Sequence, residues 1–84
     1  MNVSFTEIAW EDYQYWQKND KKLVKKINQL IQDIKRSPFE GIGKPEGLKY
    51  DLAGKWNRRI NDEHRLVYQT EGDNLIVYAC RYHY

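Results

Sequence analysis

The strongest constraint on the fold is an amphipathic segment between Asp20 and Ser37. Six aliphatic residues recur in it at the helical period: Leu23, Val24, Ile27, Leu30, Ile31 and Ile34. Asp20 can cap the start of a helix, and Pro38 ends it because the residue before a proline avoids helical backbone angles. The pattern therefore predicts a helix over residues 21–35 with one face buried against another layer.

A shorter helix is predicted before it, capped by Thr6 and ended at Asn19-Asp20. Four of its residues lie on one side: Ala9, Trp10, Tyr13 and Trp16. An aromatic stripe at this spacing is more often part of the core than a base-stacking surface. The two helices together predict an αα-hairpin whose apolar face covers the rest of the chain.

The remainder of the chain has the pattern of strands separated by tight turns. Strands are expected at 48–52, 55–61, 64–70 and 75–82, with the segment 2–5 as a fifth, while the glycine-rich segment 39–47 is expected to be a loop. Trp56, Arg58 and Ile60 alternate with Lys55, Asn57, Arg59 and Asn61, so the two sets occupy opposite faces. We predict an α+β fold, with two N-terminal helices packed on a twisted antiparallel sheet, in a single domain covering residues 1–84.

Composition excludes several classes of protein. Cys80 is the only cysteine, so neither an internal disulfide nor a cysteine-based zinc site can form. It lies in an apolar segment, where we interpret it as a small core residue in a reducing compartment. No secretion signal or membrane-spanning run is apparent, which predicts a cytoplasmic protein without a membrane partner. No His, Asp and Glu residues have metal-ligand spacing, so we expect no metal and no cofactor.

The positive charge is concentrated in the middle of the chain. The net charge is only +2, yet residues 18–65 contain thirteen of the fourteen Lys and Arg residues, against seven acids. Five lysines surround the start of the second predicted helix: Lys18, Lys21, Lys22, Lys25 and Lys26. Such a cluster favours a polyanionic partner or can simply be a solvated helix face.

The last four residues are chemically unusual for a chain end: Arg81, Tyr82, His83 and Tyr84. A histidine can transfer a proton near neutral pH, an arginine binds phosphate and a tyrosine stacks on a base. The alternative is a polar tail that happens to be aromatic. In a regular strand His83 and Tyr84 would face opposite sides, so they can serve one site only if the chain end bends.

Metal-free RNA cleavage needs a base, an acid and cations that stabilise the phosphorane. Glu46, His83, Arg59 and Arg65 are candidates for these roles, and Lys49 could help to keep the Glu46 carboxylate ionised. Each has a simpler interpretation. Glu46 could be a solvated loop acid, Arg59 a surface cation, and Arg65 a partner of the carboxylates of Asp62 or Glu63. His64 is interpreted as a structural or exposed histidine.

Several segments resemble the YoeB (Txe) toxins of the RelE/ParE superfamily: 13–16, 38–41, 43–46, 56–60, 63–68 and 79–84. The resemblance covers the whole chain. It implies a RelE-like microbial ribonuclease fold and an mRNA interferase that cuts mRNA in the ribosomal A site. The implied partners are a YefM-like antitoxin, the ribosome and mRNA, and a homodimer is left open.

The resemblance also implies residue roles. Glu46 would be the general base, His83 the general acid, Arg65 the group that stabilises the phosphate, and Tyr84 a residue that holds the substrate. Lys49, Arg59 and Arg81 would be RNA-binding cations. The alternative function is a non-catalytic toxin of the same fold that inhibits DNA gyrase or binds RNA; such a binder has no need for Glu46 and His83 together.

Overall fold

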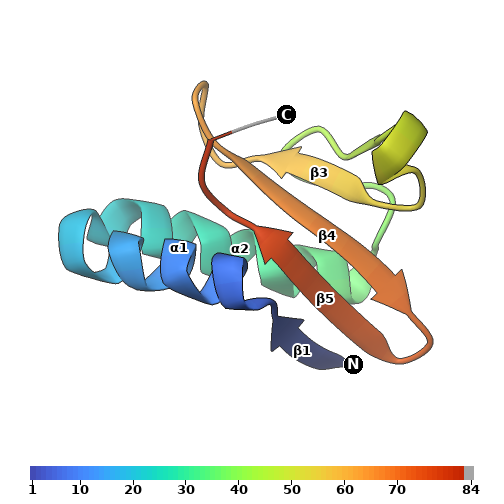
Figure 1. Cartoon of the computed structure of the whole chain (residues 1–84), viewed down its shortest axis with the longest axis horizontal. Helices are drawn as coiled ribbons and strands as arrows, with labels where there is room; N and C mark the ends of the chain where they lie inside the picture. Colours follow the sequence, from blue (N-terminus) through green and yellow to red (C-terminus); the bar gives the residue numbers. More distant parts are fainter. Residues whose placement is uncertain (83–84) are drawn as a thin grey trace.

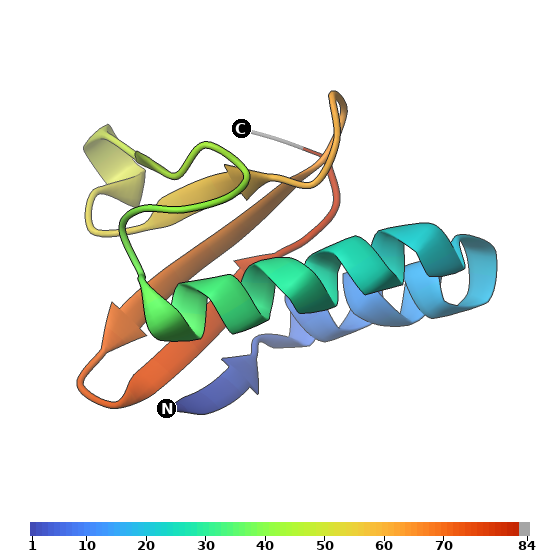
Figure 2. The same ribbon diagram turned by 180° about the vertical axis from the view of Figure 1, so that it is seen from behind.

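The computed structural model describes residues 1–82, which form two layers (Figure 1). The elements in chain order are β1 (Asn2–Phe5), α1 (Glu7–Asn19), α2 (Lys21–Arg36), β2 (Glu46–Gly47), the 3-10 helix η1 (Tyr50–Leu52), β3 (Trp56–Arg59), β4 (Arg65–Glu71) and β5 (Asn74–Ala79). Figure 1 views the molecule from the side of the sheet, and Figure 2 shows α1 and α2 packed on the opposite face. The predicted α+β architecture is confirmed.

Both helices begin and end where the local signals predict. The Thr6 hydroxyl accepts a hydrogen bond from the backbone N–H of Ala9 at 3.2 Å. The Asp20 carboxylate accepts from the N–H groups of Lys22 and Leu23, at 3.1 and 3.3 Å. The helix α2 then ends at Ser37, immediately before the proline. Within the described part of the chain, no helix combines the length and the apolar character needed to cross a membrane.

The core lies between the helices and one face of the sheet. Ile27, Leu30 and Ile34 of α2 are fully buried, and they share one cluster with four sheet residues: Leu66, Tyr68, Leu75 and Val77. Cys80 belongs to this cluster, as predicted. Trp10 departs from the prediction because it is 47% exposed and stacks on Tyr13 at the edge of the core.

The sheet has the order β1-β5-β4-β3-β2. The four strands from β2 to β5 pair antiparallel in an unbroken series. The N-terminal segment is the predicted fifth strand, but it runs parallel to β5, so the sheet is mixed. The parallel pairing continues to the start of α1, where the Thr6 N–H donates to the carbonyl of Val77.

Two predicted strand boundaries are wrong. Residues 48–52 do not form a strand, because Tyr50 has a φ of 58° and begins η1. The edge strand is instead β2, formed by the last two residues of the segment that was predicted to be a loop. The last strand ends at Ala79 rather than at residue 82, so the chain leaves the sheet at Cys80.

Arg58 supports the segment that leads from α2 to β2. Its side chain is fully buried and pairs with the Asp33 carboxylate of α2. Its guanidinium also donates to the carbonyl oxygens of Ser37, Glu40 and Ile42, at 2.6, 2.9 and 3.1 Å. The sequence pattern places Arg58 on the same face of the strand as Trp56 and Ile60, but it does not reveal that this face is the buried one or which partners the guanidinium finds.

The Asp33–Arg58 pair predicts a specific loss of stability in acid. The hydrogen bond from Arg58 holds the pKa of Asp33 below its ordinary value of 3.8. A carboxyl with a lowered pKa stabilises the fold above its unfolded pKa, and the contribution is lost as the pH falls through the folded pKa. We therefore expect Asp33→Asn to be less stable than wild type at pH 7, with a difference that shrinks below about pH 4. Urea unfolding at several pH values checks this, and a constant difference would contradict it.

Candidate functional site

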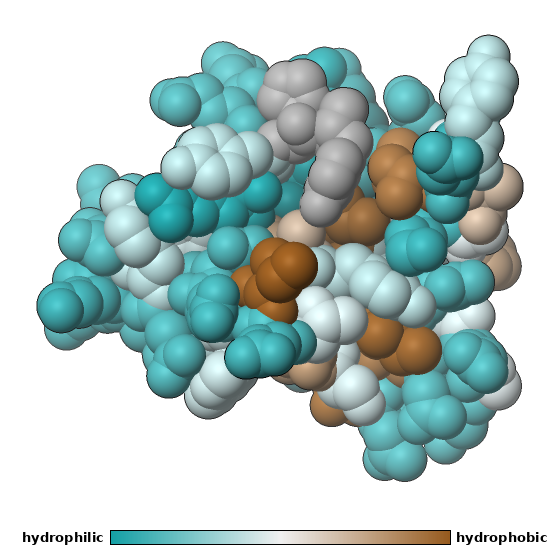
Figure 3. Space-filling view, viewed as in Figure 1, coloured by the Kyte–Doolittle hydropathy of each residue, from teal (hydrophilic) through white to brown (hydrophobic). Residues whose placement is uncertain are grey.

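The candidate site lies on the face of the sheet that α1 and α2 leave uncovered. Directly opposed residues of antiparallel strands point to the same face. The pairing of Arg58 with Leu66 and of Trp56 with Tyr68 defines the core face. Glu46 is opposite Asn57, and Arg59 is opposite Arg65, so these side chains share the outer face. In the space-filling view this side is largely hydrophilic, with hydrophobic side chains interspersed over the strands (Figure 3).

Two arginines face each other on this surface, where β3 ends and β4 begins. Directly opposed residues of an antiparallel pair have Cβ atoms about 4.5–5.5 Å apart, and like charges at that distance repel. Within residues 1–82 neither Arg59 nor Arg65 forms an ion pair with a carboxylate. The arrangement is unfavourable by itself and becomes favourable when an anion such as a phosphate lies between the guanidinium groups.

The guanidinium of Arg65 is held by the turn that precedes β4. It donates to the carbonyl oxygens of Asn61 and His64, at 2.8 and 3.2 Å. The Asn61 side chain accepts from the N–H groups of Glu63 and His64, at 2.9 and 2.8 Å, which fixes the turn. Backbone carbonyls of this turn therefore orient Arg65, in place of the carboxylates of Asp62 and Glu63.

Glu46 lies near the two arginines on the outer face, on the strand next to the one that carries Arg59. Its position opposite Asn57 makes it a diagonal neighbour of Arg59, for which Cβ atoms are roughly 7–8 Å apart. The residue is exposed on the edge strand β2, so a substrate can reach its carboxylate. Lys49 is also exposed but lies beyond β2, at the start of η1. Sheet pairing thus joins Glu46, Arg59 and Arg65, and it does not bring Lys49 beside them.

The end of the described chain is hydrogen-bonded to Arg65, one member of the arginine pair. The backbone N–H of Arg65 donates to the carbonyl of Tyr82 at 2.8 Å. Tyr82 has a φ of 63°, so the alternation of a regular strand no longer applies at this point. The predicted site residues His83 and Tyr84 lie outside the described residues. Arg81 is directed elsewhere, with its guanidinium 3.6 Å from the ring centre of Tyr15 in α1.

The predicted basic cluster is a separate surface. Its five lysines lie on the last turn of α1 and the first two turns of α2, and four are exposed while Lys26 is half-buried. Figure 1 shows this turn at the left end of the helical hairpin, away from β3. No member pairs with a carboxylate within residues 1–82.

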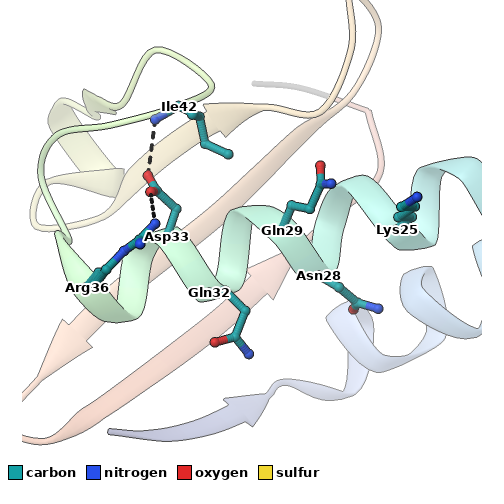
Figure 4. Close-up of a pocket in the computed structure, with 7 residues that line it drawn as sticks. All are labelled: Lys25, Asn28, Gln29, Gln32, Asp33, Arg36 and Ile42. Atoms are coloured by element: carbon teal, nitrogen blue, oxygen red, sulfur yellow. Dashed lines mark hydrogen bonds and ion pairs between the residues drawn. The ribbon is translucent and has the colours of Figure 1, made fainter.

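A further groove lies on the solvent side of α2. Figure 4 shows its lining residues: Lys25, Asn28, Gln29, Gln32, Asp33, Arg36 and Ile42. All but Ile42 come from α2, which packs on the other face of the sheet, so the groove is distinct from the surface that carries Glu46, Arg59 and Arg65.

Other catalytic chemistries find no support in the described residues. Burial raises the pKa of the Cys80 thiol to about 12, so this group is not a ready nucleophile. Within residues 1–82 no three His, Cys, Asp or Glu side chains gather in a way that could hold a metal ion. The groups that the sheet brings together are a carboxylate and two guanidinium groups.

Comparison with known proteins defines the class. Residues 5–84 match the family described as YoeB-like toxins of bacterial type II toxin–antitoxin systems. The chain is 58% identical to toxin YoeB of Escherichia coli K12 over 84 residues, which cover all of this chain and all of that protein. The molecule is therefore a toxin of a type II toxin–antitoxin system, and within that class it belongs to the YoeB-like family.

Solved structures agree with this assignment. The YoeB/ParE toxin from Agrobacterium tumefaciens has a TM-score of 0.98 and 51% identity, with full coverage of both chains. A YoeB dimer from Staphylococcus aureus has a TM-score of 0.95 and 53% identity, and a YoeB–YefM complex from the same organism has 0.93 and 52%. Each covers all of this chain and 98% of the compared chain.

Proposed function

We propose that this toxin is a metal-independent endoribonuclease that cuts mRNA in the ribosomal A site and so stops translation. The observation that carries the proposal is the outer face of the sheet. Arg59 and Arg65, which form no ion pair with a carboxylate of residues 1–82, lie opposite each other. Glu46 is the diagonal neighbour of Arg59, and the backbone of Tyr82 is hydrogen-bonded to that of Arg65. A surface that presents two cations beside one accessible carboxylate fits a phosphodiester next to a ribose hydroxyl.

The proposed reaction is an internal transesterification. The Glu46 carboxylate takes the proton of the ribose 2′-hydroxyl, and the 2′-oxygen attacks the adjacent phosphorus. Arg59 and Arg65 stabilise the extra negative charge of the phosphorane. His83 gives a proton to the departing 5′-oxygen while Tyr84 holds the substrate. The products are a 2′,3′-cyclic phosphate and a 5′-hydroxyl, so the proton balance closes without a metal or a cofactor.

The ends of cellular mRNAs test the function. After expression of the toxin, we expect new 5′ and 3′ ends in translated mRNAs, at positions in phase with codons. The cuts should disappear when translation initiation is blocked, because the ribosome is part of the proposed substrate. Intact mRNA accompanied by DNA damage would support inhibition of gyrase instead.

A toxin of this kind is held inactive by its antitoxin. We propose a YefM-like protein as that partner, on the basis of the YoeB–YefM complex from S. aureus. The S. aureus dimer supports the further proposal that this chain forms a homodimer. Co-expression followed by size-exclusion chromatography with light scattering tests both assemblies.

The lysine cluster gives a separate prediction about ribosome binding. Replacing Lys22 by Glu should weaken binding and lower the slope of log affinity against log salt by about one if Lys22 contacts a phosphate. The same replacement at Lys35, at the other end of α2, is the control and should leave the slope unchanged. Glu near a helix N-terminus interacts favourably with the helix dipole, so Lys22→Glu should not unfold α2. Equal slopes for both variants would show that the cluster is an ordinary solvated surface.

A further inference from the structure

The C-terminal segment is held by side chains after it leaves the sheet. Cys80 follows the last residue of β5, and both of its backbone polar groups bond to side chains of α1. The Cys80 N–H donates to the carboxylate of Asp12 at 3.1 Å. The Trp16 indole N–H donates to the Cys80 carbonyl at 2.8 Å. Trp16 is a buried core residue, so this anchor is fixed to the rigid part of the molecule.

A second anchor holds Tyr82. Its backbone N–H donates to Nδ1 of His64 at 2.7 Å, and its carbonyl accepts from the Arg65 N–H at 2.8 Å. His64 is only 8% exposed, and its ring packs edge-on against Trp16 with the centroids 4.7 Å apart. Because Nδ1 accepts a hydrogen bond, the proton of the neutral ring is on Nε2.

Residue 81 is fixed between these two anchors. The Arg81 guanidinium lies 3.6 Å from the ring centre of Tyr15 and 4.9 Å from that of Tyr82. Three successive residues are thus attached to α1 and to the start of β4, although none of them belongs to a strand. We call residues 80–82 with these contacts the C-terminal mount.

We propose that His64 is a positioning residue that, through its Nδ1 acceptor, fixes the point from which the terminal His83 and Tyr84 extend. The inference rests on the function proposed above and goes beyond it, because His64 itself does not touch the substrate. A segment that has left the sheet needs other contacts to fix its backbone. A displacement of about 1 Å at a catalytic group can cost roughly a hundredfold in rate. The hydrogen bonds to His64 and Arg65 fix Tyr82, the residue that precedes the proposed catalytic pair.

Two replacements of His64 separate positioning from packing. His64→Phe keeps a ring against Trp16 but removes the acceptor for the Tyr82 N–H. His64→Asn places its Oδ1 near the former position of Nδ1 and so keeps the acceptor, but it loses the ring. We expect His64→Phe to lower the single-turnover rate of RNA cleavage on programmed ribosomes by about a hundredfold. His64→Asn should stay within a few-fold of wild type even if it melts at a lower temperature, and both should bind ribosomes normally.

An activity-independent measurement accompanies the rates. Amide hydrogen exchange of Tyr82 should be slow in wild type and His64→Asn and fast in His64→Phe. The positioning role would be overturned if the cleavage rates of the variants followed their melting temperatures rather than the presence of an acceptor at residue 64. A wild-type cleavage rate for His64→Phe would overturn it as well. If His64→Phe does not fold, His64→Ala removes the same acceptor without adding a phenyl ring and is expected to give the same fast exchange of Tyr82 and slow cleavage.

Failure of the proposed function gives a different result. If wild type does not cut RNA on ribosomes, the endoribonuclease proposal is wrong. The C-terminal mount then has no role in RNA cleavage. The exchange comparison then still decides whether His64 holds Tyr82. Slow exchange in His64→Phe would show that it does not.

Discussion

Glu46→Gln and His83→Gln are each expected to abolish growth arrest by this toxin. Removal of a general base or a general acid typically lowers a rate by about a hundredfold to ten-thousandfold. Glu46 is exposed on the edge strand β2, so an uncharged residue of the same shape should leave the fold intact. Single-turnover cleavage of mRNA on ribosomes, at matched protein concentration, measures the effect directly.

Glu71→Gln is the matched control for this experiment. Glu71 is exposed at the other end of β4 and, by strand alternation, lies on the same face of the sheet as Arg65. It should arrest growth and cut mRNA as wild type does. Circular dichroism and melting curves of all variants should overlap with those of wild type. If folded Glu46→Gln still cuts RNA at the normal rate, Glu46 is not the base.

The helices could be predicted because their signals are local. Apolar spacing in α2, the cap at Asp20 and the stop at Ser37-Pro38 all lie within one segment. The strands depend on partners elsewhere in the chain, and their limits were less predictable. Tyr50 adopts a backbone angle that its residue type does not suggest, and β2 exists only because Glu46 and Gly47 pair with β3. The parallel direction of β1 likewise depends on where α1 begins relative to β5.

The sequence nominates candidate site residues, but it does not give the geometry that places Glu46, Arg59 and Arg65 on one face of the sheet. Alternation in β3 already separates Arg59 from Arg58, yet the sequence does not give the register that sets Arg59 opposite Arg65. The anchors at Asp12, Trp16 and His64 were not foreseen as partners of the C-terminal segment, because they are 18 to 68 residues away from it in sequence. The one available signal for Arg58 was that it shares a strand face with Trp56 and Ile60. A charged residue on a buried face requires a partner.

The two adjacent arginines of β3 test whether one of them stabilises the fold while the other acts in the proposed site. Arg58 is fully buried, and its guanidinium satisfies the Asp33 carboxylate, the Tyr68 hydroxyl and three backbone carbonyls. Arg59 is exposed on the outer face and is opposed by another arginine. The sequence repeats one residue type, but the sheet gives the two side chains unrelated environments.

Arg58→Met should therefore destabilise the protein severely. Breaking a buried ion pair by removing one partner costs about 3–5 kcal/mol, because the remaining charge and carbonyls are left unsatisfied. For a domain of this size such a loss lowers the melting temperature by more than about 10 °C.

Arg59→Met should change stability by less than about 0.5 kcal/mol, since it removes a surface charge and relieves repulsion with Arg65. It should nevertheless lower RNA cleavage by about a hundredfold, the usual effect of losing one group that stabilises transition-state charge. Thermal melting and single-turnover cleavage of both variants test these expectations. A stable Arg58→Met would show that the Asp33 pair does not hold the segment before β2. A fully active Arg59→Met would remove Arg59 from the proposed site.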